Sequence, residues 1–390
     1  MATNSLTIEQ INTVLNSIVS QATGSSAIAN YNGNSLITVA QTALLSSPDT
    51  VMKAVSQVLS RTIFSIRNYT AKFPTLRADT QRYGNIVRKI NFIDWDNQQN
   101  ESYSLTDGES VDMYTVKLLS LLQTNFYGQV TWEKQLTTFL TQLDTAFQSA
   151  SQFGSFWSSL LTHVNNQIEQ SHETLARALV VNLIASIISE NSTYRVYPLI
   201  TNYNAETGLE LTKEDIYKPE NFPAFMAWAA SRIARIRRML TERTSLYHTN
   251  VTGKVVMRHT PYENQKMYLY APVMFDLNMR ALTELFNDKY IKLGENQIVS
   301  YWQSSQSPDE ISQTPVYMGA DGAVKTGTAV TRSDIFGVIF DEDAIGYTVV
   351  NERQRTTPLN ARGEYFNTFF KYNDRYWMDN SENAIVLTLA

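Results

Sequence analysis

The sequence predicts an α+β fold that carries a long two-stranded arm outside its own core. Three observations predict it. Residues 155–189 contain neither glycine nor proline and repeat apolar residues at helical spacing. Residues 84–122 are polar and extended, and the chain closes on short apolar segments separated by turns. Long helical runs and separate runs of strands are typical of an α+β protein.

The first 46 residues are predicted to form an N-terminal arm with a helical head. Thr7 and Gln10 have the spacing of a capping box ahead of an apolar face. A second helix is expected from Ser47, because Pro48 occupies the first helical position, which proline favours.

The extended arm is predicted as two strands, Gly84–Trp95 and Val111–Leu122, joined by a tip at residues 96–110. A two-stranded ribbon has no core of its own and is at best marginally stable in water. In the first strand, apolar and charged residues occur at both odd and even positions. A strand that is half-buried on its own core instead alternates apolar and polar residues with a period of two. The arm therefore needs a surface, which we expect another copy of the chain to supply.

Candidate anchors of that contact are the aromatic residues of the arm, because aromatic side chains dominate interface energetics. They are Phe92, Trp95 and Tyr103, and Leu105 is the other apolar residue of the tip.

After the arm, a helix is expected over Glu133–Gln148, with a break at Phe153-Gly154 and a long helix from Ser155 to about Ser189. At ~1.5 Å per residue this helix is about 50 Å long. The mean helix has only about eleven to twelve residues. Because the heptad pattern drifts around Gln167–Thr174, we interpret it as one helix lying across a sheet rather than as a coiled coil.

The second half of the chain is predicted to be mixed. A turn-rich connector over residues 191–223 leads to further helices and strands, and no repeat of fixed period is present. The expected helices are Ala224–Arg243 and Asp276–Phe286, and the expected strands are Lys254–His259, Met267–Val273, irregular strands over 297–331, Gly337–Phe340, Tyr347–Val350, Glu364–Tyr372 and Ala384–Leu389.

Composition favours self-association. The 390 residues are 43% apolar, enough for a substantial core, but only 18% charged, against roughly 25% in ordinary domains. Low charge with 21 Tyr and 6 Trp is typical of interface cores. A net charge of −5 argues against a protein whose main function is to bind nucleic acid. There are no cysteines, which excludes disulfides and thiol chemistry, and no membrane span or signal peptide is expected.

The motifs for catalysis are weak. The four histidines, His163, His172, His248 and His259, lack metal-ligand spacing and are expected to be surface or partly buried residues. The segment Gly319–Gly322 lacks the ending of a phosphate loop and is predicted as a surface turn. Asp341, Glu342 and Asp343 are expected at a solvated corner. A hydrolase that uses Asp341, Asp343 and Glu352 is the enzymatic alternative.

One helix is rich in arginine. Arg232, Arg235 and Arg238 recur at three-residue steps, and Arg237 and Arg243 follow on the same helix. Arg235 and Arg238 are candidates for contact with DNA or with a neighbour's acidic surface. The alternative is a solvated helix face.

The order of elements resembles that of the major capsid proteins of tailed bacteriophages with the Hong Kong 97-like fold. In size and in the layout of its elements, the chain is similar to the capsid proteins of small podophages of the phi29-like group. Residues 123–133 are similar to that family's passage from extended loop to spine helix. Residues 336–345 resemble the end of the family's axial strand. Residues 355–358 and 365–370 together resemble its pair of peripheral strands, and residues 381–388 resemble its final strand, which returns to the axial domain.

The resemblance implies a domain plan: an N-terminal arm at residues 1–46, an extended loop at 62–122, a peripheral domain from 47–61, 123–199 and 346–376 with a spine helix at about 150–190, and an axial domain from 200–345 and 377–390. It implies a structural protein without enzymatic activity or cofactor. It also implies that the protein assembles in the host cytoplasm into hexamers and pentamers of an icosahedral head around double-stranded DNA.

The implied partners are other copies of the chain, a separate scaffolding protein, a portal protein and DNA contacted non-specifically, with no membrane. A non-viral surface or shell protein that self-assembles is the alternative.

Overall fold

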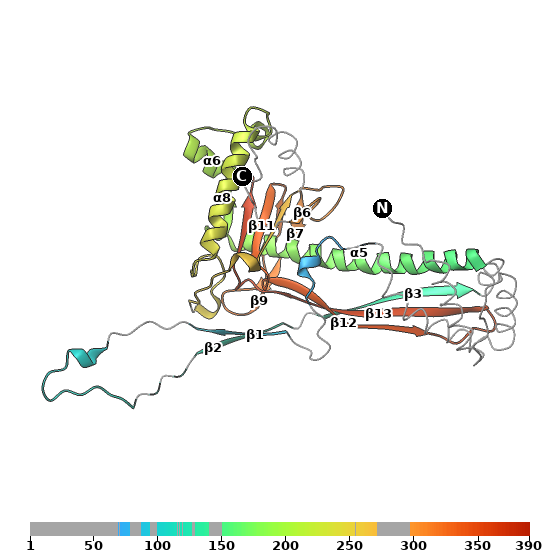
Figure 1. The fold of residues 1–390 in the computed structure, drawn as a ribbon, viewed down its shortest axis with the longest axis horizontal. Coiled ribbons are helices and arrows are strands. Elements are labelled where there is room, and N and C mark those ends of the chain that lie inside the picture. Colours follow the sequence, from blue (N-terminus) through green and yellow to red (C-terminus); the bar gives the residue numbers. More distant parts are fainter. Residues whose placement is uncertain are drawn as a thin grey trace.

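The computed structural model describes residues 69, 71–78, 87–93, 100–114, 116, 118, 120–126, 129–139, 150–253, 255–270 and 297–390. A body of helices and a five-stranded sheet lies at the centre of Figure 1. One long helix extends from it along three strands, and a narrow arm leaves the body in the opposite direction (Figure 1). The helices expected near the N-terminus, from Ser47 and over Asp276–Phe286 lie outside the described residues.

The predicted long helix is confirmed as α5, Ala150–Glu190, 41 residues long. The expected break at Phe153-Gly154 is wrong, because α5 runs through Gly154. A single glycine inside a helix costs only about 1 kcal/mol, which a helix of this length tolerates. By length and composition, Thr162–Glu190 could cross a membrane, but 67% of its apolar window is buried inside the fold, as in a core helix.

The five-stranded sheet has the order β4-β14-β11-β5-β6. Its central strands β14 and β11 are buried on both faces. They match the strands expected at Ala384–Leu389 and Gly337–Phe340. β5 confirms the strand expected at Met267–Val273 as far as Tyr270, and the rest of that range lies outside the described residues. β4 and β6 pair in parallel at the edges. The bounds are β4 Val196–Pro198, β14 Ala384–Thr388, β11 Ile335–Asp341, β5 Gln265–Tyr270 and β6 Gln297–Val299.

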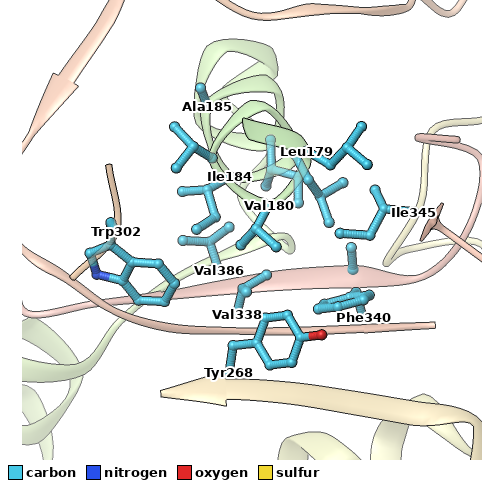
Figure 2. Packing of buried hydrophobic residues seen from close by; sticks show 14 of the residues in the cluster. Leu179, Val180, Ile184, Ala185, Tyr268, Trp302, Val338, Phe340, Ile345 and Val386 are labelled. Atoms are coloured by element: carbon cyan, nitrogen blue, oxygen red, sulfur yellow. The ribbon is translucent and has the colours of Figure 1, made fainter. Parts of the chain in front are cut away.

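Alternate residues of these strands feed two hydrophobic cores. Val338 and Val386 point to the α5 side, where they pack with residues such as Ile184 and Trp302 (Figure 2). Ile339 belongs to the second core on the opposite face. The period of two therefore places one sheet between two apolar layers, which is why its central strands contain no exposed residue.

Three helices cover the second face: α6 (Leu199–Thr207), α7 (Lys213–Ile216) and α8 (Phe222–Leu240). The expected helix at Ala224–Arg243 is thus confirmed with slightly shifted ends. The strand expected at Lys254–His259 is wrong where the structure describes it. Residues 255–259 form a single bridge, Thr244↔Arg258, between the short 3-10 turns η4 (Val251–Gly253) and η5 (Tyr262–Asn264).

A three-stranded sheet lies under the outer part of α5 in the order β12-β13-β3 (Figure 1). β12 (Ile345–Thr356) and β13 (Tyr365–Met378) contain and extend two of the expected closing strands. β3 (Gln129–Phe139) contradicts the helix expected over Glu133–Gln148, as far as Phe139. Pairing with β13 overrides the helical preference of this segment, and the rest of it lies outside the described residues.

The arm is a ribbon of β1 (Val87–Phe92) and β2 (Leu121–Phe126), closed by the pair Phe92↔Leu121. The second strand expected at Val111–Leu122 therefore begins ten residues later, and no described residue from 111 to 120 is in a strand. Instead, the Asp112 carboxylate accepts a hydrogen bond from the Tyr114 amide, a local contact that competes with strand pairing. The tip is a long loop with one short turn, η3 (Glu101–Tyr103).

Small elements complete the fold. The 3-10 turn η2 (Pro74–Leu76) packs against the α5 core. β7 (Ile311–Gln313) pairs with β10 (Val330–Arg332), and β8 (Val316–Met318) pairs with β9 (Val324–Thr326). The turn predicted at Gly319–Gly322 is confirmed as the exposed end of the β8–β9 hairpin, where Gly322 has φ +78°.

Gly337 lies where β11 and β5 approach closely. A Cβ there would lie 2.6 Å from the Tyr268 carbonyl oxygen and 2.6 Å from Leu269 Cδ2. We expect Gly337→Ala to lower the free energy of unfolding by about 1–3 kcal/mol, because the backbone of a strand in the middle of a sheet cannot move aside for an added methyl group. Urea unfolding followed by circular dichroism measures it. Gly208→Asn is the control: that position has φ +72° and open space, so little change is expected. Equal stability of the two variants would contradict the prediction.

Candidate assembly interface

The arm is fixed to its own subunit by a buried ion pair at its base. Lys89 Nζ of β1 lies 3.1 Å from Asp379 Oδ2 and also pairs with Glu382. Burial alone would lower the pKa of Lys89, but attraction to these carboxylates outweighs it and raises that pKa. Arg258 pairs with Glu382 from the other side. Sequence reasoning assigned no role to Lys89, because its partners lie at the far end of the chain.

The acceptor of Lys89 is a buried polar turn, residues 379–383, between β13 and β14. Several of its groups form hydrogen bonds within the subunit. Ser381 donates its amide and its hydroxyl to Asp379 Oδ1 at 2.9 and 2.6 Å, and Asn380 Nδ2 donates to Glu190 Oε1 at 3.2 Å. The turn therefore joins the arm to the C-terminal end of α5.

Beyond its base, the arm exposes a concentration of large apolar side chains. Tyr103 is 93% exposed and Leu118 86%. The others are Ile90, Phe92, Leu105, Val111, Met113, Tyr114, Val116 and Leu121. Large contiguous apolar exposure marks an interaction surface. In the isolated subunit no other described segment covers this surface, because the arm extends away from the body (Figure 1).

Of the arm residues selected from sequence, Phe92 is 60% exposed at the end of β1, and Tyr103 and Leu105 lie in the tip. Trp95 lies outside the described residues. The segment from Val111 to Leu118 was expected as a polar strand, yet it carries more exposed apolar side chains than the predicted anchors. The number of apolar residues in this short segment of the sequence was the signal that could have identified it as part of the exposed apolar surface.

On α8, Arg235 and Arg238 are both exposed, and no described residue forms an ion pair with either. Arg232 pairs with Glu206 across to α6. Arg237, by contrast, is buried, and its Nε donates to Gln265 Oε1 at 3.0 Å. The sequence did not place Arg237 on the face of Arg232, Arg235 and Arg238, and in the structure Arg237 helps to hold α8 on β5.

Two of the acidic candidates for catalysis, Asp341 and Asp343, differ in their exposure, and the side chain of Glu352 lies outside the described part of the structure. Asp341 is buried and accepts a hydrogen bond from the Thr260 hydroxyl at 2.7 Å, and burial raises its pKa. The expectation of a solvated corner holds for Glu342 and Asp343 but is wrong for Asp341. Among the described residues, no group of three His, Cys, Asp or Glu could hold a metal ion.

The histidines differ from expectation in part. His163 and His259 are exposed, but His172 and His248 are fully buried. His172 Nε2 lies 3.2 Å from Asp374 Oδ1 between α5 and β13. This contact is structural: it lies inside the sheet–helix interface, where Tyr372 packs edge-on against the imidazole.

A pocket of about 570 Å³ lies beside α5, lined mainly by neutral polar side chains. Its two charges neutralise each other, because Arg177 donates to Glu173 Oε1 at 2.8 Å. Tyr69 donates to the same carboxylate, and this hydrogen bond is the main cause that raises the pKa of Tyr69 to about 12. Nothing in this set provides a free acid, base or nucleophile.

His248 makes stability depend on pH. Its Nδ1 lies 3.1 Å from Asn383 Oδ1, and burial lowers its pKa to about 4. Between pH 6.5 and 4 the unfolded chain therefore binds a proton that the folded chain does not. As pH falls through that window, we expect a loss of up to roughly 3 kcal/mol.

The measurement is urea unfolding at pH 7.5 and pH 5. His248→Asn keeps a donor for Asn383 and should flatten this difference, since an amide does not titrate. The same pH dependence in both proteins would show that His248 is not its source.

Comparison with solved structures places this fold among viral shells. The structure is similar to the capsid of Staphylococcus phage Andhra, with a TM-score of 0.56 and 11% identity, over 83% of this chain and 86% of that one. It is also similar to a structure described as the head fiber and inner core protein of native bacteriophage P68, with a TM-score of 0.54 and 12% identity, over 82% and 85%. These similarities assign the chain to the Hong Kong 97-like fold.

The family model described as Phi29-like phage major capsid protein matches residues 11–388. This match spans nearly the whole chain, so the chain belongs to that family. It is a major capsid protein of a bacteriophage, a self-assembling structural subunit located in the virion capsid. A search of curated proteins found no match.

Proposed function

We propose that this capsid subunit assembles by laying its arm on an adjacent copy, while the domain at the other end of α5 closes rings of six and five copies. The exposed apolar surface of the arm carries the proposal. Side chains such as Leu118 and Tyr103 gain about 25 cal/mol for each Å² of apolar surface that a neighbour covers. Closed rings require one patch to meet a different patch on the next copy, and an arm supplies such a contact.

The proposed division into domains is the one that the family resemblance implies. The axial domain is residues 200–345 and 377–390, and the peripheral domain is residues 47–61, 123–199 and 346–376. The loop is residues 62–122 and the N-terminal arm residues 1–46. Support comes from the two sheets: α6–α8 gather on the five-stranded sheet, and the outer part of α5 lies on the three-stranded one.

Within the arm, Phe92, Trp95, Tyr103 and Leu105 are the proposed contacts. On the axial domain they are Arg235 and Arg238, whose exposed guanidinium groups suit a carboxylate on a neighbouring copy. Charged pairs of this kind fix register more than they add affinity.

The protein acts without catalysis in this proposal, because the acids considered for hydrolysis are divided between a buried Asp341 and an exposed Asp343. Its further partners are a separate scaffolding protein, a portal protein and packaged DNA contacted non-specifically. The net charge of −5 opposes tight binding of DNA, so the contact with DNA is weak in this proposal.

A photo-crosslinking amino acid at Tyr103 tests the arm contact. In assembled particles we expect crosslinked species of two or more chains, seen by denaturing gel and mass spectrometry. Dissociated subunits are the matched control and should give none. Crosslinks confined to one chain in intact particles would refute the proposal. Electron microscopy of the same particles tests for rings of six and five.

A further inference from the structure

Two aspartates of the chain are followed directly by glycine: Asp107 in the tip of the arm and Asp321 in the β8–β9 hairpin. An aspartate in this position is open to attack by its own main chain. The amide nitrogen of the next residue can reach the side-chain carboxyl carbon, and glycine has no side chain to hinder the approach. Both pairs are exposed at turns, so the contacts around each pair decide whether it reacts.

The hairpin restrains its pair. The Gly322 amide, which would be the attacking group, donates to the Gly319 carbonyl oxygen at 2.9 Å. The carboxylate of Asp321 is held as well. Its Oδ1 accepts the Ala323 amide at 3.2 Å, and its Oδ2 lies 3.1 Å from Lys325 Nζ. A reaction in the hairpin therefore has to open the turn and release the carboxylate first.

The tip of the arm lacks these restraints. Its turn is closed by the Glu109 amide, which donates to the Thr106 carbonyl oxygen at 3.1 Å, so the Gly108 amide is not the closing donor. No described residue forms a hydrogen bond or an ion pair with the Asp107 carboxylate or donates to or accepts from the Gly108 amide. No described atom outside its chain neighbours lies within 4 Å of a Cβ placed on Gly108. Both reacting groups are thus free.

We propose that Asp107 is a self-modification site, where the free subunit converts its main chain to an isoaspartyl linkage. The Gly108 nitrogen bonds to Cγ of Asp107, and one carboxyl oxygen leaves as water with the amide proton and a proton from solvent. Water then opens the resulting five-membered ring at the main-chain carbonyl carbon. The chain afterwards runs through Cγ and is longer by one carbon, and the carboxylate is kept. Water is the only co-reactant.

The modification limits the time for which an unassembled subunit stays competent. An extra main-chain carbon in the turn between Thr106 and Glu109 displaces the exposed tip residues Tyr103 and Leu105 relative to the base of the arm. This consequence rests on the proposed function, because it matters only where the tip contacts a neighbouring copy. In a shell, a covered tip is held in one conformation, so the reaction is slower there.

Incubation of dissociated subunits at neutral pH tests the site. An isoaspartyl methyltransferase with labelled S-adenosylmethionine detects the product, and peptide mass spectrometry locates it. We expect the product at Asp107 to form roughly tenfold faster than at Asp321, which is about 1.4 kcal/mol and close to the net value of one hydrogen bond. The pair Asn32-Gly33, outside the described residues, loses ammonia instead of water and is separated by its peptide.

Two variants sharpen the test. Asp107→Glu keeps the charge and should abolish the product at that residue, since a longer side chain closes a ring less readily. Lys325→Ala frees one oxygen of Asp321 and should speed the reaction there. No product at Asp107, or equal rates at the two aspartates of the unaltered chain, would overturn the inference.

The assembled state separates this inference from the proposed function. In intact particles we expect slower formation of the product at Asp107 than in subunits. Equal rates in particles and subunits would leave the modification site standing and count against the contact of the arm. If aged subunits assemble as well as fresh ones, the limit on competence is overturned. Aged and fresh Asp107→Glu subunits, which should not differ from each other, are the control.

Discussion

Deleting Asn97–Glu109 leaves, as the expected result, folded subunits that form no shells. The segment contributes to neither hydrophobic core, since the residues of both cores lie in other elements. The free energy of unfolding should therefore change by less than about 0.5 kcal/mol. Assembly should be lost, because the deletion removes Tyr103 and Leu105 together with the carboxylates of Glu101, Asp107 and Glu109.

Sedimentation and electron microscopy measure the particles, and thermal unfolding followed by circular dichroism checks the subunit. Replacement of the same residues by a glycine–serine segment of equal length is the matched control. It restores length without side chains, so it should fail to assemble as well. Normal particles from the deletion would contradict the role of the arm, and shells from the replacement would show that length alone suffices.

Lys89→Met is expected to lower the free energy of unfolding by roughly 3–5 kcal/mol. The substitution leaves the buried carboxylates of Asp379 and Glu382 without their main cation, and an uncompensated buried charge has a cost of this size. Arg258 still pairs with Glu382, so the lower end of that range applies if it compensates. The ribbon should also lose its fixed attachment, and the amides of β1 and β2 should exchange hydrogen faster.

Arg88→Met is the matched control, because Arg88 is the exposed neighbour of Lys89 on the same strand. It should change stability by no more than about 0.5 kcal/mol. Urea unfolding and hydrogen exchange by mass spectrometry measure both effects. Equal stability of the two variants would show that the ion pair does not hold the base of the arm.

Patterns that extend over many residues could be predicted from the sequence. The apolar repeat of α5 and the continuous apolar run of β14 follow from local chemistry, and both elements are present. β3 was predicted as a helix because the residues of Glu133–Gln148 favour one locally. Its strand depends on pairing with β13, as in the bond from Thr137 to Asn367, 230 residues away. No local pattern records such a partner.

The candidate interface shows the same limit. The need of the arm for an external surface followed from its composition, but its loop is longer than expected because Val111–Leu118 finds no partner strand. Lys89 and Arg237 were ordinary charged residues in the sequence. Their roles arise from a buried turn and a neighbouring strand that the fold alone brings to them.

One mechanical consequence follows from the continuity of α5, β12 and β13. All three begin or end in the same core, where Ile345 and Met378 pack with Ile184, and all three run outward together into the three-stranded sheet. A force on the outer end is thus carried by unbroken backbone into the centre of the subunit. Under an outward load on the shell, we therefore expect each subunit to tilt as one stiff unit, so that the strain falls on the junctions between copies.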